Sequence, residues 1–208
     1  DVLETAYDMG LTSLPPTKET LARVGLSLTL GGGEVRLLDL TGAYSAFFNG
    51  GTKAESLAIL KVEDNNGKVL EEITPKKGKK VISPEEAFII SNILSDNSAR
   101  SDAFGPNSQL NIAGRQIAVK TGTTNDKRDN WTIGGNPQRA AGVWVGNNDN
   151  SPMLNVASGV SGASPIWRRI ILESLSGLDP VNFEQPEGVI SSEVDVMSGR
   201  IADDNFTS

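Results

Sequence analysis

The stretch Lys120-Thr121-Gly122-Thr123-Thr124 decides how this chain is interpreted. It follows a largely apolar run at 116–119 that is typical of a β-strand, and it leads into a polar loop at 125–130. A strand that ends in this way brings an ammonium group, hydroxyl groups and an unobstructed backbone together at one point. Those groups suit the binding of a carboxylate and an acyl group.

Strand geometry limits how these residues can act together. Lys120 and Thr121 point to opposite faces of a strand, so both can serve one site only along the open edge of a sheet. Such an edge offers unpaired N–H and C=O groups to which an extended peptide can add. We therefore expect Lys120 to supply positive potential and a proton path and Thr121 to bind a carboxylate. Gly122 would leave room for a second backbone, and the Thr123 N–H would face an oxyanion.

The triplet Lys-Thr-Gly alone is weak evidence, because chance produces it in about one chain in twenty of this length. For an isolated triplet, an ordinary edge strand with a solvated lysine and two β-favouring threonines is the better explanation. The sequence around it therefore has to decide between the two interpretations.

Composition excludes several classes of chemistry. The chain has 208 residues and a net charge of −7, and its basic residues are scattered, which argues against a nucleic-acid partner. It has no cysteine and no histidine. A Ser-His-Asp triad and a His-ligated or Cys-ligated metal site are thereby excluded, and we predict no metal and no cofactor. Proton transfer would use Lys, Tyr, a carboxylate or water.

The absence of cysteine fits an extracytoplasmic protein. No run of 18 apolar residues and no signal peptide is visible. The first residues, 1–6, have the character of a helix interior and include no initiator Met. We therefore expect the chain to be part of a longer protein.

The hydrophobic pattern predicts an α+β fold. Ser83 and Pro84 are typical of a helix start. Helices are expected at 2–9, 37–48, 84–94 and 166–175, a hairpin at 57–62 and 68–70, and strands at 115–123, 130–135 and 139–146. The short polar breaks between the last three strands indicate an antiparallel meander.

Three further groups of residues could suggest a function, and for each we prefer a structural explanation. The glycines at 31–33 are expected to form a flexible turn rather than a phosphate cradle, since no Gly-Lys-Ser/Thr follows. Three aspartates could be read as paired carboxylates for glycoside hydrolysis, and three tryptophans as surfaces for carbohydrate stacking. We instead expect Asp126, Asp129 and Asp149 to lie in or beside turns, and Trp131, Trp144 and Trp167 to pack in the core.

Four further segments have to be considered together, in their order along the chain. They are Leu37–Gly51, with Leu30-Gly31 before it; Ala118–Asp126, followed by Asp129-Asn130-Trp131; Gly142–Asp149; and Gly162–Trp167. In this order they resemble the transpeptidase domain of class A penicillin-binding proteins, the bifunctional peptidoglycan synthases of bacteria. The resemblance covers about residues 2–186.

This resemblance implies a penicillin-binding protein/serine β-lactamase-like transpeptidase fold, in which helices flank an antiparallel sheet. It implies an acyl-serine mechanism that cross-links stem peptides ending in D-Ala-D-Ala and is trapped by β-lactams. Residues 120–123 match the third motif of the family, with Lys120 catalytic and Thr121, Gly122 and Thr123 binding substrate. The parent protein would act at the extracytoplasmic face of the bacterial cytoplasmic membrane, anchored through regions that precede this chain.

The chain departs from the family in its nucleophile. No Ser-x-x-Lys occurs in the 208 residues, and neither Thr74-Pro75-Lys76-Lys77 nor Thr124-Asn125-Asp126-Lys127 is a credible substitute. Ser95-Asp96-Asn97 spells the second motif, Ser-x-Asn, but lies on the wrong side of the 37–48 helix, so we interpret it as a polar helix exit. The Phe-x-Gly-Tyr of the family is Thr132-Ile133-Gly134-Gly135 here.

We therefore expect residues 1–179 to be the C-terminal part of a transpeptidase domain without its N-terminal strands and nucleophile helix. Residues 180–208 would be an extension or the start of a small β unit. The strand at 139–146 would then have an open edge, and this chain alone would be inactive and of low stability. Two different functions stay open: a non-catalytic module that binds cell-wall peptides, or a relative of serine β-lactamases or D,D-carboxypeptidases.

Overall fold

The computed structural model describes residues 2–153 and 161–201. Its centre is an antiparallel sheet with the strand order β5-β6-β7, formed by Ala118–Thr123, Asp129–Asn136 and Arg139–Gly146. The predicted meander is thus confirmed. Two residues connect β6 to β7, and Asn136 Oδ1 accepts the N–H groups of both Gln138 and Arg139 at 3.0 Å, which closes this turn.

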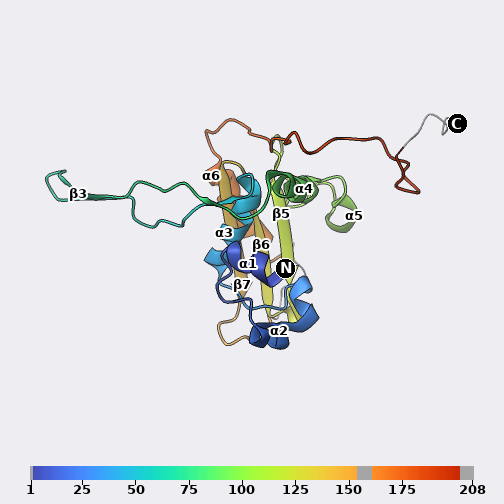
Figure 1. The fold of residues 1–208 in the computed structure, drawn as a ribbon, viewed down its shortest axis with the longest axis horizontal. Helices are drawn as coiled ribbons and strands as arrows, with labels where there is room; N and C mark the ends of the chain where they lie inside the picture. Colours follow the sequence, from blue (N-terminus) through green and yellow to red (C-terminus); the bar gives the residue numbers. More distant parts are fainter. Residues whose placement is uncertain (1, 154–160, 202–208) are drawn as a thin grey trace.

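Helices cover both faces of the sheet, so the predicted α+β fold is confirmed (Figure 1). Helix α3 spans Leu37–Phe48 and packs on β6 and β7, and α6 spans Ala163–Ser174 and packs on the same two strands from the other face. The approach of α3 is close at Gly142, where a Cβ atom would lie 2.0 Å from Thr41 Oγ1. A larger residue at 142 would separate helix from sheet.

The larger hydrophobic core lies between α6 and the sheet. Trp167 and Ile171 of α6 are fully buried against Val119, Ala141 and Val143 of the strands. A smaller core joins Met9 to Ala43 and Ala46 on α3. The buried residues of α3 are Ala43, Ala46 and Phe48.

Helix α4, Pro84–Ser95, begins as predicted. Ser83 Oγ accepts the Glu86 N–H at 3.1 Å, and the Glu86 carboxylate accepts the Ser83 N–H at 2.8 Å. This capping box satisfies main-chain donors that a helix start otherwise leaves free. Helix α4 contacts α3 and β5, so it covers the end of the sheet where β5 begins.

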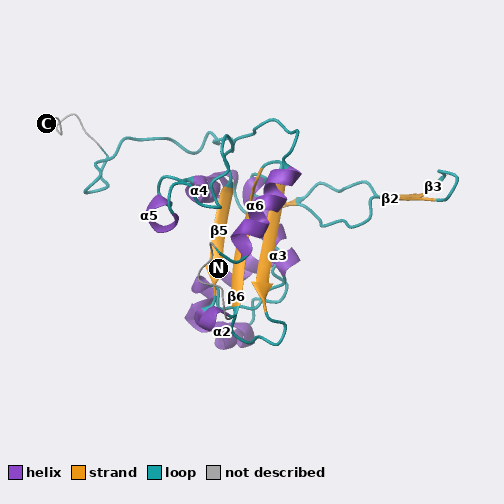
Figure 2. Ribbon diagram, turned by 180° about the vertical axis from the view of Figure 1, so that it is seen from behind, coloured by secondary structure: helices purple, strands orange, loops and turns teal. Residues whose placement is uncertain are grey.

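A long arm leaves the body between α3 and α4 (Figure 2). Its base is the pairing of β1, Thr52–Lys53, with β4, Lys79–Lys80, and its tip is the hairpin of β2, Lys61–Glu63, and β3, Val69–Glu72. The hairpin was predicted around the turn at 64–67, but its strands lie a few residues later than expected.

Other boundaries also differ from the predictions. Helix α1 spans Val2–Asp8, close to the predicted 2–9, while α2 (Lys18–Val24), the 3₁₀ turns η1 (Gly25–Leu30) and η2 (Asn125–Lys127), and α5 (Ser101–Phe104) were not predicted. Helix α6 begins at Ala163 rather than Ile166, because Pro165 is tolerated in a first helical turn. Strand β5 begins at Ala118 rather than Arg115, whose N–H closes a turn on Ile112.

Residues 181–186 pack back onto the body, and Phe183 contacts the ring of Phe48 with centroids 6.0 Å apart. Beyond them the described chain runs outward as an exposed segment (Figure 1), where Val194 and Ile201 form an isolated bridge. No strand forms in the described part of 180–208, that is, 180–201. A domain boundary at 179/180 stays a prediction.

Candidate functional site

The Lys-Thr-Gly-Thr residues lie on β5, which is an outer strand of the sheet. Within residues 2–153 and 161–201, β5 pairs only with β6. Lys120 and Thr123 are exposed, and Thr121 is half-buried. Sequence reasoning therefore placed these residues correctly on an open strand edge.

Lys120 reaches this edge although its side chain starts from the opposite face to that of Thr121. Its Nζ donates to the main-chain oxygen of Thr121 at 2.6 Å. None of the carboxylates that the structure describes forms an ion pair with it. The ammonium charge is thus held at the strand edge, where it can attract an anionic ligand.

Gly122 faces no tight contact with the residues that the structure describes. A Cβ atom at this position would lie 3.6 Å from Trp131 Cβ, which is an ordinary van der Waals distance. Packing within the described chain therefore does not require a glycine there. The small residue leaves free surface beside Lys120.

Thr123 is held by Asn130, a residue that sequence reasoning did not single out. Asn130 is fully buried, its Nδ2 donates to Thr123 Oγ1 at 3.1 Å, and its Oδ1 accepts the Ala163 N–H at 2.7 Å. Because the Thr123 oxygen already accepts a hydrogen bond, its own proton is available to a ligand. The sequence feature that could have identified Asn130 is a polar residue at the start of a predicted strand, in Asp129-Asn130-Trp131.

A second buried hydrogen bond lies behind Thr121. Thr132 is the cross-strand partner of Thr121, and its Oγ1 is 2.9 Å from Ser164 Oγ on α6. Both hydroxyl-bearing residues are fully buried. Helix α6 is therefore fastened to the sheet directly behind two of the predicted site residues.

Arg100 lies at the other end of the open edge. Its Nη1 donates to the Val119 oxygen at 3.4 Å and its Nη2 to the Leu94 oxygen at 2.6 Å. Burial lowers the pKa of Arg100, which the nearby Asp96 partly offsets, and an arginine so placed stays charged. Arg100, Ile93, Phe104 and Thr121 line a groove of about 270 Å³ along β5.

Ser95 and its neighbours act as a helix exit, as predicted. Ser95 Oγ donates to the Asn92 oxygen at 3.0 Å and accepts from Gln116 Nε2 at 3.2 Å, and Asp96 Oδ1 accepts the Ala99 N–H at 2.9 Å. These bonds fasten the end of α4 to the residues before β5.

The three aspartates considered for glycoside hydrolysis have structural roles as well. Asp129 accepts from Trp144 Nε1 at 2.8 Å, Asp149 accepts from Ser151, and Asp126 lies in a turn at φ 59°. Among the tryptophans, the core prediction holds only for Trp167. Trp131 and Trp144 are half-buried, with ring centroids 6.4 Å apart.

The turn predicted for Gly31–Gly33 is present between η1 and α3. A Cβ atom at Gly33 would lie 2.8 Å from Leu14 Cδ2, so this glycine permits close packing rather than anion binding. Among the described residues, no group of three or more acidic side chains could hold a metal ion.

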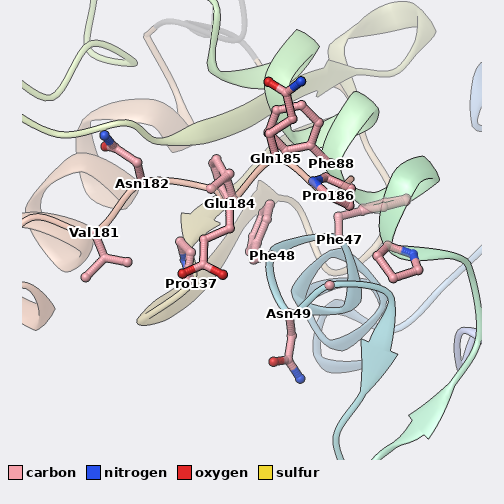
Figure 3. A pocket seen from close by; sticks show the side chains of 13 residues that line it. Phe47, Phe48, Asn49, Phe88, Pro137, Val181, Asn182, Glu184, Gln185 and Pro186 are labelled. Atoms are coloured by element: carbon pink, nitrogen blue, oxygen red, sulfur yellow. The ribbon is translucent and has the colours of Figure 1, made fainter. Parts of the chain in front are cut away.

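A larger hollow, of about 360 Å³, lies away from this strand (Figure 3). It is lined by Phe47 and Phe48 of α3, Phe88 of α4, and the segment 181–186. No residue of β5 lines it. It is where the chain beyond α6 packs onto the body.

The antiparallel sheet, its helices on both faces and the Lys-Thr-Gly-Thr outer strand agree with the fold expected from the resemblance to penicillin-binding transpeptidase domains. Residues 13–171 match the family model described as the penicillin binding protein transpeptidase domain. The chain belongs to this family.

Relatives with known names agree with this membership. Penicillin-binding protein 1A of Neisseria meningitidis serogroup A is 34% identical over 171 residues, which are 80% of this chain and 21% of that protein. The predicted class A resemblance is confirmed. The chain thus spans about a fifth of the length of such curated relatives.

Solved structures show the same fold. Penicillin-binding protein 1A from Haemophilus influenzae superposes with a TM-score of 0.74 at 25% identity, over 88% of this chain and 34% of that one. PonA1 from Mycobacterium tuberculosis, solved in complex with penicillin V, gives a TM-score of 0.72 at 25% identity, over 88% of this chain and 52% of that one.

Proposed function

We propose that this chain forms one wall of the active site of a peptidoglycan D,D-transpeptidase, opposite a nucleophilic serine carried by the rest of the parent protein. The observation that carries the proposal is the open edge of β5, where an ammonium group and two threonines lie together in a member of this family. The substrates would be stem peptides ending in D-Ala-D-Ala, and β-lactams would bind as their analogues.

The proposed roles rest on the match of residues 120–123 to the third motif of the family and on their position at the edge of β5. Thr121 would bind the terminal carboxylate of the donor peptide, and Lys120 would add positive potential and a proton path. The Thr123 N–H would donate to the oxyanion that forms at the scissile carbonyl, and one such donor is worth about 3 kcal/mol of barrier. The Thr123 hydroxyl, with its oxygen held by Asn130, would donate to the same carboxylate.

The parent would act at the extracytoplasmic face of the bacterial cytoplasmic membrane, as its family resemblance implies. In the part of the chain that the structure describes, no helix combines the length and the apolar character that crossing a membrane demands.

Labelled penicillin tests the proposal. The full-length parent should form a covalent adduct, and the 208-residue chain alone should form none, because it contains no Ser-x-x-Lys. A parent that is never acylated would overturn the proposed activity. An adduct on the isolated chain would overturn the claim that the nucleophile lies elsewhere.

The sequence also favours a second candidate for the isolated chain, since the same missing motif suits a non-catalytic module that binds cell-wall peptides. Reversible binding of a D-Ala-D-Ala peptide to the cooperatively folded chain, measured by calorimetry, would support this second function. Binding that requires the parent's remaining domains would reject it.

A further inference from the structure

Gln116 lies two residues before β5 and uses both ends of its side-chain amide. Its Oε1 accepts the Phe183 N–H at 3.0 Å, and its Nε2 donates to Ser95 Oγ at 3.2 Å. Because only the oxygen of an amide can accept a main-chain N–H, the bond from Phe183 fixes the orientation of this side chain. Gln116 therefore joins three parts of the molecule: the approach to β5, the last residue of α4 and the segment 181–186.

The chain that follows α6 is itself held to the body. The ring of Phe183 contacts that of Phe48 on α3, and the segment 181–186 lines the hollow shown in Figure 3. Just before this segment, Asp179 O accepts from Gln138 Nε2 at 3.1 Å, which ties the chain to the turn between β6 and β7. The segment can therefore serve as a support against which Gln116 is held.

The two ends of β5 are held by different bonds. At the end of the strand, Thr123 Oγ1 accepts from the buried Asn130 at 3.1 Å. At its beginning, the side chains of Gln116 and Arg100 link the strand to the last turn of α4. Among the described residues only β6 pairs with β5, so one edge of the strand has no ladder to restrain it. Loss of the link at Gln116 should therefore tilt β5 about its far end.

Such a tilt would change the groove along β5. Lys120 and Thr121 line this groove together with Ile93 and Leu94 of α4. Both site residues lie nearer to the beginning of β5 than Thr123 does. Lys120 and Thr121 would therefore move most, while the Thr123 N–H keeps its place.

We propose that Gln116 is a positioning residue that holds the beginning of β5 between α4 and the segment 181–186. This inference rests on the proposed transpeptidase function, in which Lys120 and Thr121 receive the carboxylate of the ligand. Gln116 acts through the strand and takes no part in bond making. A buried or half-buried amide with both ends paired is suited to this role, because it holds its partners in one geometry.

The test uses the full-length parent and a fluorescent penicillin. The rate of labelling at increasing penicillin concentrations gives the Kd of the non-covalent complex and the limiting rate of acylation separately. Gln116→Met keeps the length of the side chain and removes both hydrogen bonds, and it should raise Kd about fivefold. The limiting rate and the final labelled fraction should not change. Gln116→Glu still accepts the Phe183 N–H and can accept from the Ser95 hydroxyl, so its Kd should lie between those of the wild type and Gln116→Met.

Gln138 provides a matched control. It is the same residue type, is also half-buried, and also bonds to the chain that follows α6, but it does so from the turn between β6 and β7. Gln138→Met should loosen the same part of the chain and leave the Kd for penicillin unchanged.

The possible outcomes distinguish the role of Gln116 from the proposed activity. An unchanged Kd in Gln116→Met, or in Ser95→Ala if the Met variant does not fold, would overturn the role of Gln116 while penicillin labelling still supports the transpeptidase. A smaller labelled fraction at an unchanged Kd would show a loss of folded protein alone and would also overturn it, as would an equal rise of Kd in Gln138→Met. A parent that penicillin never acylates would overturn the proposed function, and the inference with it.

Discussion

Asn130 links the strand of the site to the helix behind it. The Nδ2 of its side-chain amide donates to the Thr123 hydroxyl, and the Oδ1 accepts the first N–H of α6. A buried amide with both ends paired holds its neighbours in one geometry, and loss of either bond leaves a buried group unsatisfied. The orientation of the Thr123 hydroxyl therefore depends on the position of α6.

Asn130→Ala should lower the free energy of unfolding by about 1–3 kcal/mol, because the Ala163 N–H loses its acceptor. In the full-length parent it should also slow acylation by penicillin. Urea denaturation and the rate of labelling measure the two effects.

Asn136→Ala is the matched control, since Asn136 is equally buried and caps the turn at the other end of β6. It should reduce stability and leave the acylation rate unchanged. Equal slowing in both variants would contradict a specific role for Asn130.

At the scale of helices and strands, the sequence predicted best those boundaries that depend on residues next to one another in the chain. Helix α3 ends where its run of helix formers meets Asn49-Gly50-Gly51, and α4 starts at its capping box, so both were predicted within a residue. The short α5 was missed because four residues are too few to show helical periodicity. Helix α2 was missed although it is as long as α1 and Thr17 caps its start.

The site was only partly predictable for a similar reason. Lys120 to Thr123 form a local motif, which a sequence displays directly. Asn130, Arg100 and Ser164 act through contacts with residues distant in the chain, and such contacts appear only when the chain is folded.

The capping box of α4 predicts a dependence of stability on pH. Hydrogen bonds from Ser83 lower the pKa of Glu86 below its ordinary value of 4.5. A carboxylate with a lowered folded-state pKa stabilises the fold fully above its unfolded pKa and loses that contribution as pH falls through the folded pKa.

The difference in unfolding free energy between the wild type and Glu86→Gln should thus be constant at neutral pH and shrink below pH 4.5. Ser83→Ala should cost about 1 kcal/mol at neutral pH. Urea titrations over a pH series measure both. Glu85→Gln is the control, because Glu85 lies in the same turn without these bonds, and an identical pH profile for both variants would contradict the assignment.

On the scale of the whole molecule, the body and the arm contribute unequally to the free energy of unfolding. The body holds both hydrophobic cores, whereas Ile59, Leu60 and Leu70 on the arm are more than half exposed. Burial of apolar surface is the dominant favourable term in folding, so the arm contributes little.

Replacement of residues 54–78 by Asn-Gly, which joins Lys53 to Lys79 across their existing pairing, should change the unfolding free energy by less than about 0.5 kcal/mol. Trp167→Ala in the body should cost about 3–5 kcal/mol. Thermal and urea unfolding distinguish the two. A large loss of stability on removal of the arm would show that it packs on the body in solution.

The strand order β5-β6-β7 leaves the sheet with two open edges among the described residues. Each copy therefore has two different edges at which another copy can pair, as a monomer with two reactive ends does in a polymer. Strand β5 of one copy can pair with β7 of the next, and because the two edges differ, such contacts repeat head to tail without closing. A short peptide bound at β5 would then act as a chain terminator. The ligand that the site is proposed to recognise would also keep the isolated chain monomeric.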